Sequence, residues 1–358
     1  MKLAILNDTH IGARGDNPHI NDYFFRFING VFFPALKDQN IDRIVHLGDV
    51  VDRRKFINFA IWHKWQTEFF DRIESEFNLP IDMLCGNHDV YYRNTNKVNA
   101  LSELLGRYPN INIYQEPEVV EYDGLPVALV PWINNGNKES VFKFLSSCTA
   151  PIIFGHLEIA GFEMDRGNVC QEGHPRELFD RYDMVISGHF HHKSSDGTIH
   201  YLGNQYEMTW ADYNDTRGFH IFDTATRELT FVPNPYKLFF KLVYDDSVQN
   251  YEYWKSQDLS KYTNSYVKVV ATKKQNPYLF DTVMDTLYKV APIDVTIVED
   301  YTENKLESTS QVDQAEDTIT IIRKCIDSMT IPDAIDPDRL KAMLQELYNE
   351  ALTEMSSQ

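Results

Sequence analysis

Short apolar runs, each followed by a polar turn, recur along the first quarter of the chain. Residues 2–6, 43–47 and 81–85 have the length and composition of buried strands. Two longer stretches between them, residues 18–39 and 57–77, repeat aromatic and aliphatic residues at helical spacing. Strands that alternate with helices predict a parallel or mixed sheet with helices on both of its faces.

Strand-like runs continue to about residue 232 and indicate a second layer. They centre on Asn112, Val119 and Val127 and cover residues 152–154, 184–186, 198–202, 218–222 and 228–232. We expect the first three to begin the far half of a sandwich and the last three to complete a second sheet. A helix is expected near residues 100–107.

The composition changes after Pro233-Asn234-Pro235, and four domains or segments are expected. Residues 1–235 form the first domain, and residues 236–299 form a small α+β domain with segments at 238–243, 266–271, 280–290 and 294–298. Acidic and polar residues dominate 300–317, as in a linker. Residues 318–358 contain two amphipathic stretches without a core of their own, so they either fold back or bind a partner.

Carboxylate, amide and imidazole side chains follow the ends of five expected strands. In chain order they are Asp8, His10, Asp49, Asn87, His156, His189 and His191. Ligands of such sheets bind beyond the carboxyl ends of the strands, and residues i and i+2 of an extended segment share one face. Asp and Asn also serve as helix caps and turn residues, which is the alternative for each residue alone. Their recurrence at successive strand ends favours one shared site.

The donor set of these seven side chains indicates a catalytic metal site. It offers only oxygen and nitrogen atoms, which suits manganese, iron, zinc or magnesium in catalysis better than a structural zinc ion. Seven ligands exceed what one ion with an open position needs, so we expect two ions that share one carboxylate. Such a pair clamps the attacking and leaving oxygens of a phosphoryl displacement and generates hydroxide at neutral pH.

The net charge of -19 argues against a broad basic face that holds nucleic acid. A polyanionic substrate would have to be attracted locally, by metal ions or a few arginines, or be held by a partner. The length, with 43% hydrophobic and 13% aromatic residues, indicates a globular protein of two or three units. No apolar run approaches the roughly 18 residues of a membrane helix, no secretory leader precedes the first strand, and the four cysteines lack paired spacing. We therefore expect free thiols, no membrane and a cytoplasmic location.

Five motifs carry a family resemblance. They are Asp8-x-His10, Gly48-Asp49 with Arg53, Gly86-Asn87-His88-Asp89, Gly155-His156 and Gly188-His189-x-His191. Together they resemble the motifs of the calcineurin-like metallophosphoesterases, which implies an α/β fold, a four-layered α/β/β/α sandwich. Within that superfamily the chain is most similar to the nuclease subunit of SbcCD-type DNA double-strand-break repair complexes, on Asp8-Thr9-His10-Ile11-Gly12, Tyr201-Leu202-Gly203-Asn204 and Arg217-Gly218-Phe219. Its size, acidic tail and Pro131-Trp132 especially resemble the recombination endonucleases of T-even phages.

The resemblance implies specific roles for the site residues. One divalent ion would be held by Asp8, His10, Asp49 and His191, and a second by Asp49, Asn87, His156 and His189, with manganese favoured and magnesium as the alternative. His88 would act catalytically at the scissile phosphate, by stabilising it or by protonating the leaving 3' oxygen. In the related phosphatases an aspartate at the position of Asp52 orients this histidine, so we expect an Asp52 to His88 hydrogen bond. Asp89 is expected to stabilise the turn.

The resemblance also implies macromolecular partners. These are DNA, recognised in part by a capping domain at 236–299, and a coiled-coil ABC-type ATPase bound through residues 318–352. The family forms homodimers through helices of the phosphoesterase domain, so residues 23–33 and the helix with Trp62 and Trp65 are candidate dimer surfaces.

Four further side chains are candidates for contact with substrate. They are Arg53, Arg54 and Arg93 for phosphate and Tyr91 for stacking on a frayed base. A solvated basic turn with a half-buried tyrosine would give the same pattern.

We therefore expect a metal-dependent DNA exonuclease and endonuclease that hydrolyses phosphodiester bonds at DNA ends in recombination and double-strand-break repair. Two alternatives stay open. A metallophosphatase acting on a phosphoprotein or small phosphoester fits residues 48–53, which are close to the phosphoprotein phosphatase pattern. A non-catalytic adaptor of the ATPase would carry degraded ligands, whereas all seven positions keep metal-binding side chains.

Overall fold

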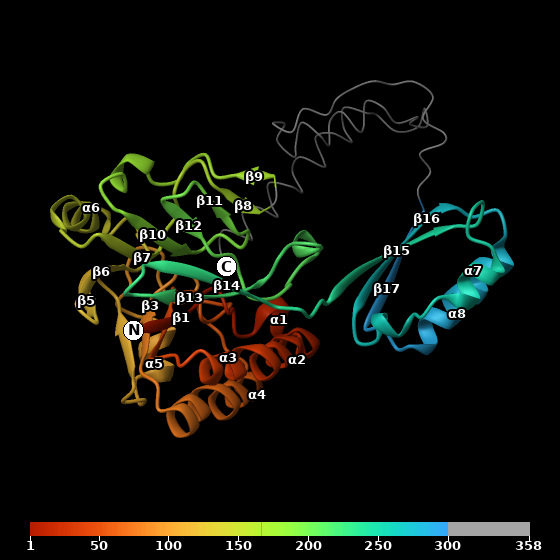
Figure 1. Cartoon of the computed structure of the whole chain (residues 1–358), viewed down its shortest axis with the longest axis horizontal. Coiled ribbons are helices and arrows are strands. Elements are labelled where there is room, and N and C mark those ends of the chain that lie inside the picture. The colour runs from red at the N-terminus through yellow and green to blue at the C-terminus, as the bar shows by residue number, and fades with distance from the viewer. Residues whose placement is uncertain (166, 300–358) are drawn as a thin grey trace, which may run out of the picture. The chain divides into compact units, whose positions relative to one another are not determined.

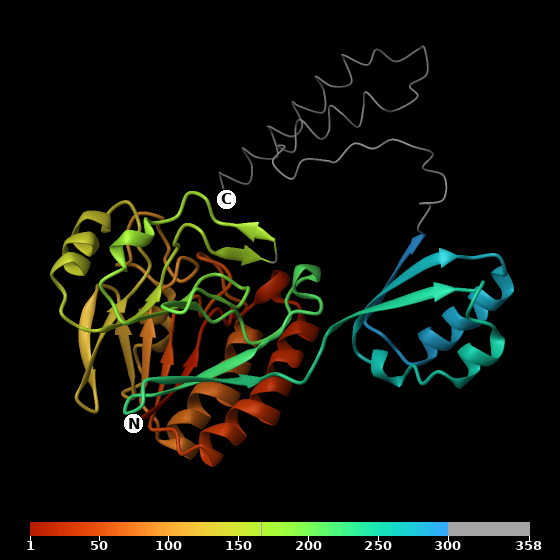
Figure 2. The same ribbon diagram turned by 45° about the horizontal axis from the view of Figure 1, so that its top comes forward.

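The computed structural model describes residues 1–165 and 167–299, and two six-stranded sheets form its larger part. The first sheet has the order β14 (Glu228–Pro233), β13 (Gly218–Asp223), β1 (Lys2–Leu6), β2 (Arg43–His46), β3 (Ile81–Leu84) and β4 (Ile111–Tyr114). The second has the order β11 (Ser194–Ser195), β12 (Ile199–Tyr201), β10 (Met184–Gly188), β7 (Ile152–His156), β6 (Leu125–Val130) and β5 (Glu118–Tyr122). The two sheets lie beside each other in Figure 2.

Helices cover the outer face of each sheet (Figure 1). On the first sheet these are α1 (Ala13–Asp16), α2 (Pro18–Phe27), α3 (Phe33–Asp38), α4 (Phe59–Trp65) and α5 (Ala100–Leu105), while α6 (Lys138–Ser147) covers the second. Single π-helical turns connect α2 to α3 and extend α4 to Phe77, so both long helical predictions are confirmed. Asn17 caps the N-terminus of α2, because its side chain accepts hydrogen bonds from two main-chain N–H groups, and Pro18 is the first helical residue.

Three apolar cores separate the layers. One lies between the two sheets and contains Leu3, Val45, Phe154 and Ile186. The other two lie between each sheet and its helices. This arrangement of helix, sheet, sheet and helix layers confirms the predicted four-layered α/β/β/α sandwich.

Three strand assignments were wrong. The strand at Asn112 is β4, which pairs with β3 in the first sheet and not in the far half of the sandwich. The runs at 218–222 and 228–232 are β13 and β14, which also join the first sheet because β13 pairs antiparallel with β1. Of the three runs expected to complete the second sheet, only the one at 198–202 lies in it, as β12. The chain therefore returns to its first sheet after completing the second.

Residues 239–299 form a separate parallel sheet with a core of its own. Its strands are β15 (Phe239–Asp245), β16 (Tyr266–Lys273) and β17 (Asp294–Glu299), in that order. The helices α7 (Tyr251–Ser256) and α8 (Pro277–Lys289) pack on it through an apolar cluster. A short hairpin, β8 (Glu163–Asp165) and β9 (Asn168–Val169), completes the strands of the described residues. The predicted linker at 300–317, the tail helices at 318–358 and Cys325 lie outside the described residues.

Several surface predictions can be compared with side-chain burial. Trp62 and Trp65 are 6% and 2% exposed, so these two rings belong to the core and offer no dimer surface. The large exposed side chains nearby are Phe56 and Phe59, at 70% and 83%. Three cysteines of the described residues are buried free thiols, as predicted. In the same part of the chain, every helix is too short or too polar to cross a membrane.

Candidate metal centre

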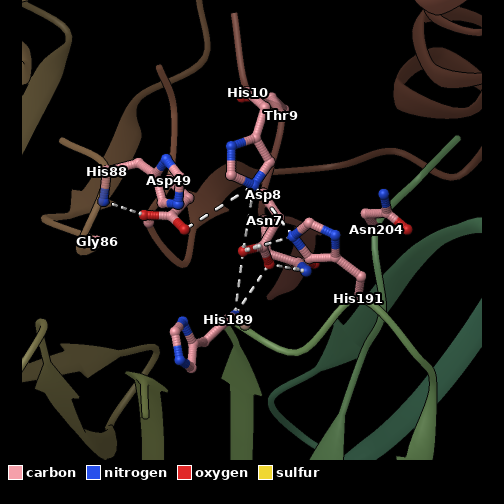
Figure 3. Close-up of polar contacts among 12 residues, drawn as sticks. Asn7, Asp8, Thr9, His10, Asp49, Gly86, His88, His189, His191 and Asn204 are labelled. Atoms are coloured by element: carbon pink, nitrogen blue, oxygen red, sulfur yellow. Dashed lines mark hydrogen bonds and ion pairs between the residues drawn. The ribbon is translucent and has the colours of Figure 1, made fainter. Parts of the chain in front are cut away.

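The candidate ligands follow strands that are neighbours in the two sheets. Strand β1 leads to Asp8 and His10, β2 to Asp49, β3 to Asn87, β7 ends in His156, and β10 leads to His189 and His191. The carboxyl ends of the parallel strands β1, β2 and β3 meet at one edge of the first sheet, as do those of β7 and β10 in the second. Side chains that are up to 183 residues apart in sequence therefore meet in one place (Figure 3).

The turns that carry these ligands have an uncommon backbone. Four ligand positions have left-handed φ angles, at 49° for Asp8, 44° for His10, 55° for Asp49 and 82° for His189. Residues other than glycine avoid this region, and each such conformation costs of order 1 to 3 kcal/mol. The surrounding contacts must therefore hold the turns in place.

One group of ligand atoms belongs to Asp8, His10 and His191. All three atoms lie within 4.8 Å of one another. The Nε2 atoms of His10 and His191 face each other at 3.1 Å, and each lies 4.0 Å from Asp8 Oδ1. Asp8 is in turn fixed by the side-chain amide of Asn7, which donates to Oδ2 over 2.6 Å.

A second group consists of Asp49, His156 and His189, again within 4.8 Å of one another. The Nδ1 atom of His156 donates to the main-chain oxygen of Leu47 over 2.8 Å, since a carbonyl can only accept. Its Nε2 atom then faces Asn87 Oδ1 at 2.9 Å and Asp49 Oδ2 at 3.4 Å. This orientation is the one in which an imidazole presents its lone pair to a metal ion.

Asp49 lies between the two groups. Its Oδ2 atom is 3.4 Å from His156 Nε2 in the second group and 3.9 Å from His10 Nε2 in the first. Its Oδ1 atom accepts a hydrogen bond from the main-chain N–H of His88 over 2.8 Å. One carboxylate oxygen thus faces both groups, which is the position a shared ligand requires.

The electrostatics of the site favour a bound cation. Burial acts to raise the pKa of Asp49, but the His156 imidazole outweighs it and holds that pKa well below its usual value. Burial acts to lower the pKa of His156, but Asp49 and Asp8 raise it to about 9. Burial lowers the pKa of His189 to about 3, so this ring is neutral and able to coordinate. Converging oxygen and nitrogen donors that attract positive charge fit divalent metal ions.

Asp89 organises the turn beneath these ligands. Its buried carboxylate accepts four main-chain hydrogen bonds, from Gly86, Asp49, Val50 and Val51, over 2.8 to 3.1 Å. Burial and the Asp49 carboxylate raise the pKa of Asp89 to about 7. The predicted role of Asp89 in stabilising the turn is confirmed, and it extends to the turn that carries Asp49.

The predicted hydrogen bond between Asp52 and His88 is present, but its acceptor is the main-chain oxygen of Asp52 and not the carboxylate. Nδ1 of His88 bonds over 2.5 Å to the main-chain oxygen of Asp52, and the Asp52 carboxylate instead lies 3.5 Å from Nδ1 of His10. The ligand-type atoms of His10, Asp52 and His88 also lie within 4.8 Å of one another. The carboxylate of Asp52 thus lies beside His10 of the first ligand group, and the main-chain oxygen of Asp52 contacts His88.

The four candidate substrate contacts are not equally available. Arg53 is held by an ion pair with Asp16, and one terminal nitrogen of Arg54 is buried without a hydrogen-bond partner among the described residues. Arg93 is exposed, and Tyr91 is 39% exposed. Tyr91 and Arg93 are therefore the more accessible pair.

Three residues at the site were not predicted as functional. Asn7 fixes Asp8, and its position next to a ligand at the end of an apolar strand was a usable signal. Trp132 packs its ring against His189 with centroids 5.2 Å apart, and Arg217 donates to the main-chain oxygen of His191. Trp132 and Arg217 are distant from the ligands in sequence, and the signal that could have found them was their place in the resemblance motifs Pro131-Trp132 and Arg217-Gly218-Phe219.

Comparison with known proteins gives a consistent picture. Residues 1–193 match the family described as calcineurin-like phosphoesterase. The chain is 30% identical to "Exonuclease subunit 1" of Enterobacteria phage T4 over 362 residues, which cover 98% of this chain and 99% of the relative. It is 23% identical to a subunit of the SbcCD nuclease of Staphylococcus epidermidis over 356 residues, which cover 85% of this chain and 93% of the relative.

Proposed function

The chain belongs to the calcineurin-like phosphoesterase family, and we propose that it is a metal-dependent DNA nuclease that hydrolyses phosphodiester bonds at DNA ends, as exonuclease and endonuclease. The observation that carries the proposal is the position of Asp49, whose Oδ2 atom faces His10 and His156 from the two ligand groups. The phage and staphylococcal relatives are both designated nucleases, which supports DNA rather than a phosphoprotein as the substrate.

The proposed site holds two divalent ions, manganese in preference to magnesium. The first would be held by Asp8, His10, Asp49 and His191, and the second by Asp49, Asn87, His156 and His189. When bound, such ions supply a hydroxide nucleophile and neutralise charge that develops on the phosphate. They also provide local positive charge on a chain of net charge -19.

We assign His88 the role of general acid or phosphate-stabilising group. Its main chain is anchored to Asp49 Oδ1, and its Nδ1 atom donates to the Asp52 carbonyl. The ring position is therefore fixed and its other nitrogen, Nε2, is left for the substrate. From Nε2 a proton can pass to the leaving 3' oxygen. Asp52 then supports catalysis by orienting His88 through its backbone and His10 through its carboxylate.

The proposal also assigns residues to substrate contact and to assembly with partners. Arg53, Arg54 and Arg93 would contact phosphates, and Tyr91 would stack on a frayed base. Both relatives are named as subunits, which supports a partner, and we propose a coiled-coil ABC-type ATPase bound through residues 318–352. A homodimer would use the exposed Phe56 and Phe59 instead of the buried tryptophans.

A nuclease assay on defined linear DNA tests the proposal. Cleavage is expected with Mn²⁺, less or none with a chelator, and a strong decrease for His88→Ser. A parallel assay with nitrophenyl phosphate controls for general phosphatase activity. Hydrolysis of nitrophenyl phosphate without DNA cleavage would replace the proposal with a metallophosphatase, and absence of both activities would favour the adaptor.

A further inference from the structure

His191 occupies a less supported position than the other histidines of the site. His156 is the last residue of strand β7, and the main-chain N–H of His189 donates to Asp8 Oδ2 over 3.0 Å. His191 follows the end of β10 by three residues, and its side chain is 29% exposed. Contacts other than strand pairing must therefore keep its ring beside Asp8.

We propose that Arg217 is the positioning residue that holds His191 in the first ligand group, an inference that rests on the proposed metal-dependent function. The buried Arg217 guanidinium donates through Nη1 to the main-chain oxygen of His191 and to Asn204 Oδ1. The main-chain N–H of Asn204 donates to the same His191 oxygen over 3.3 Å. Two segments that follow strand β12 thus fix the backbone of His191.

Two carboxylates hold the guanidinium in turn. Nη2 of Arg217 donates to Asp212 Oδ1 over 2.7 Å and to Asp215 Oδ2 over 3.0 Å. Asp215 Oδ2 is also 2.8 Å from His192 Nδ1, so the residue after His191 is tied to the same cluster. The side chains of Arg217, Asp212 and Asp215 are 4%, 3% and 8% exposed, so solvent screens their interaction little.

The fork of an arginine is required for this set of contacts. One planar guanidinium reaches an oxygen of His191, Asn204 and two aspartates at the same time, and a lysine ammonium is a compact charge that cannot span them. Replacement by lysine keeps the buried positive charge beside Asp212 and Asp215, so it separates loss of positioning from loss of charge.

The expected effect is selective for one metal equivalent. Arg217 contacts His191 of the first group, and hydrogen bonds connect His156 and His189 of the second group to Leu47, Asn87 and Asp8 instead. Supporting contacts of metal ligands typically contribute about 10- to 100-fold in affinity. Arg217→Lys should therefore weaken one Mn²⁺ equivalent by about 10- to 100-fold and leave the other near its wild-type affinity.

Calorimetric titration of the full chain with Mn²⁺, without DNA, tests this inference. Arg43→Lys is the matched control, because Arg43 forms an equally close pair with the buried Asp82, at 2.9 Å to both oxygens, between strands β2 and β3. The control should lose some thermal stability and keep both Mn²⁺ equivalents. Arg217→Lys should lose a comparable amount of thermal stability, and it should bind one of the two Mn²⁺ equivalents more weakly.

Unchanged binding of both equivalents by Arg217→Lys would overturn the inference, as would equal weakening of both. If Arg217→Lys fails to fold, Asn204→Ala provides the test. It leaves every charge in place and removes one of the two oxygens that accept hydrogen bonds from Arg217 Nη1. It should weaken the same equivalent by a smaller factor, and wild-type binding would again overturn the inference. A wild-type chain that neither binds Mn²⁺ nor cleaves DNA would instead contradict the proposed function.

Discussion

Gly86 lies against Asp49 so closely that a single methyl group would disturb the centre. A Cβ atom at this position would be 2.2 Å from Asp49 Oδ1 and 2.3 Å from Asp49 N, whereas carbon atoms pack at about 3.5 to 4.0 Å. Gly86→Ala must therefore displace Asp49 by roughly 1 Å. Overpacking of this kind costs about 1 to 3 kcal/mol of stability. A displacement of about 1 Å in a catalytic group can cost about 100-fold in rate, so we expect cleavage to fall by that factor.

Gly124→Ala separates the effect on the site from the effect on stability. Gly124 has a φ of 80°, in the turn between β5 and β6, and its Cβ would meet no atom within 4 Å. Alanine in this left-handed conformation costs about 1 to 2 kcal/mol, which is close to the cost expected for Gly86→Ala. Urea unfolding should show similar losses for the two variants, while Mn²⁺ titration and DNA cleavage should decrease only for Gly86→Ala. Wild-type metal affinity in Gly86→Ala would refute the argument that Gly86 fixes Asp49.

Four further outcomes are expected. His88→Ser should slow cleavage by about 10²- to 10⁴-fold with both Mn²⁺ equivalents retained in a titration, and loss of an equivalent would make His88 a ligand. Asp52→Asn should leave the hydrogen bond to His88 intact, because the main-chain oxygen of residue 52 accepts it. The substitution should therefore alter Mn²⁺ affinity, through His10, more than kcat at saturating Mn²⁺. A larger effect on kcat than on Mn²⁺ affinity would contradict the contact of the Asp52 carboxylate with His10. Chelation should lower Tm and stop cleavage, and Mn²⁺ should restore both, because a ligand of the native state stabilises it. Burial lowers the pKa of His220 to about 3, whereas an unfolded histidine has a pKa of about 6.5. Between these two pH values the unfolded chain binds a proton on His220 that the folded chain does not, so the free energy of unfolding should fall by about 1.4 kcal/mol per pH unit on acidification. Urea unfolding at pH 5 and 7.5 should therefore show a smaller loss of stability for His220→Gln than for the wild type.

The strand ends and their ligands were predictable because the signal is local. An apolar run followed by a polar turn gives both the strand and the edge at which Asp8 or Asp49 lies. The sheet to which a strand belongs is not a local property, and β13 joined the first sheet through long-range pairing with β1. Asp52 illustrates another limit, because the group that bonds to His88 is a main-chain oxygen, which every residue possesses.

Burial of charge was equally inaccessible from sequence. The sequence does not show whether the guanidinium of Arg217 is solvated or, as in this structure, buried between Asp212 and Asp215. The helix with Trp62 and Trp65 was a candidate dimer surface, but helical spacing alone does not decide which of its large apolar residues face the sheet: Trp62 and Trp65 are buried, whereas Phe59 is exposed. Packing between layers settles such questions.

The left-handed turns at Asp8, His10, Asp49 and His189 have a consequence for protein engineering. Glycine adopts these φ angles without steric cost, so substitutions that relax the turns can raise the melting temperature while they remove ligands. A library of this chain selected only for heat resistance in the presence of a chelator should therefore accumulate inactive members with changes at these four positions. Directed evolution toward a thermostable enzyme needs a catalytic screen in every round.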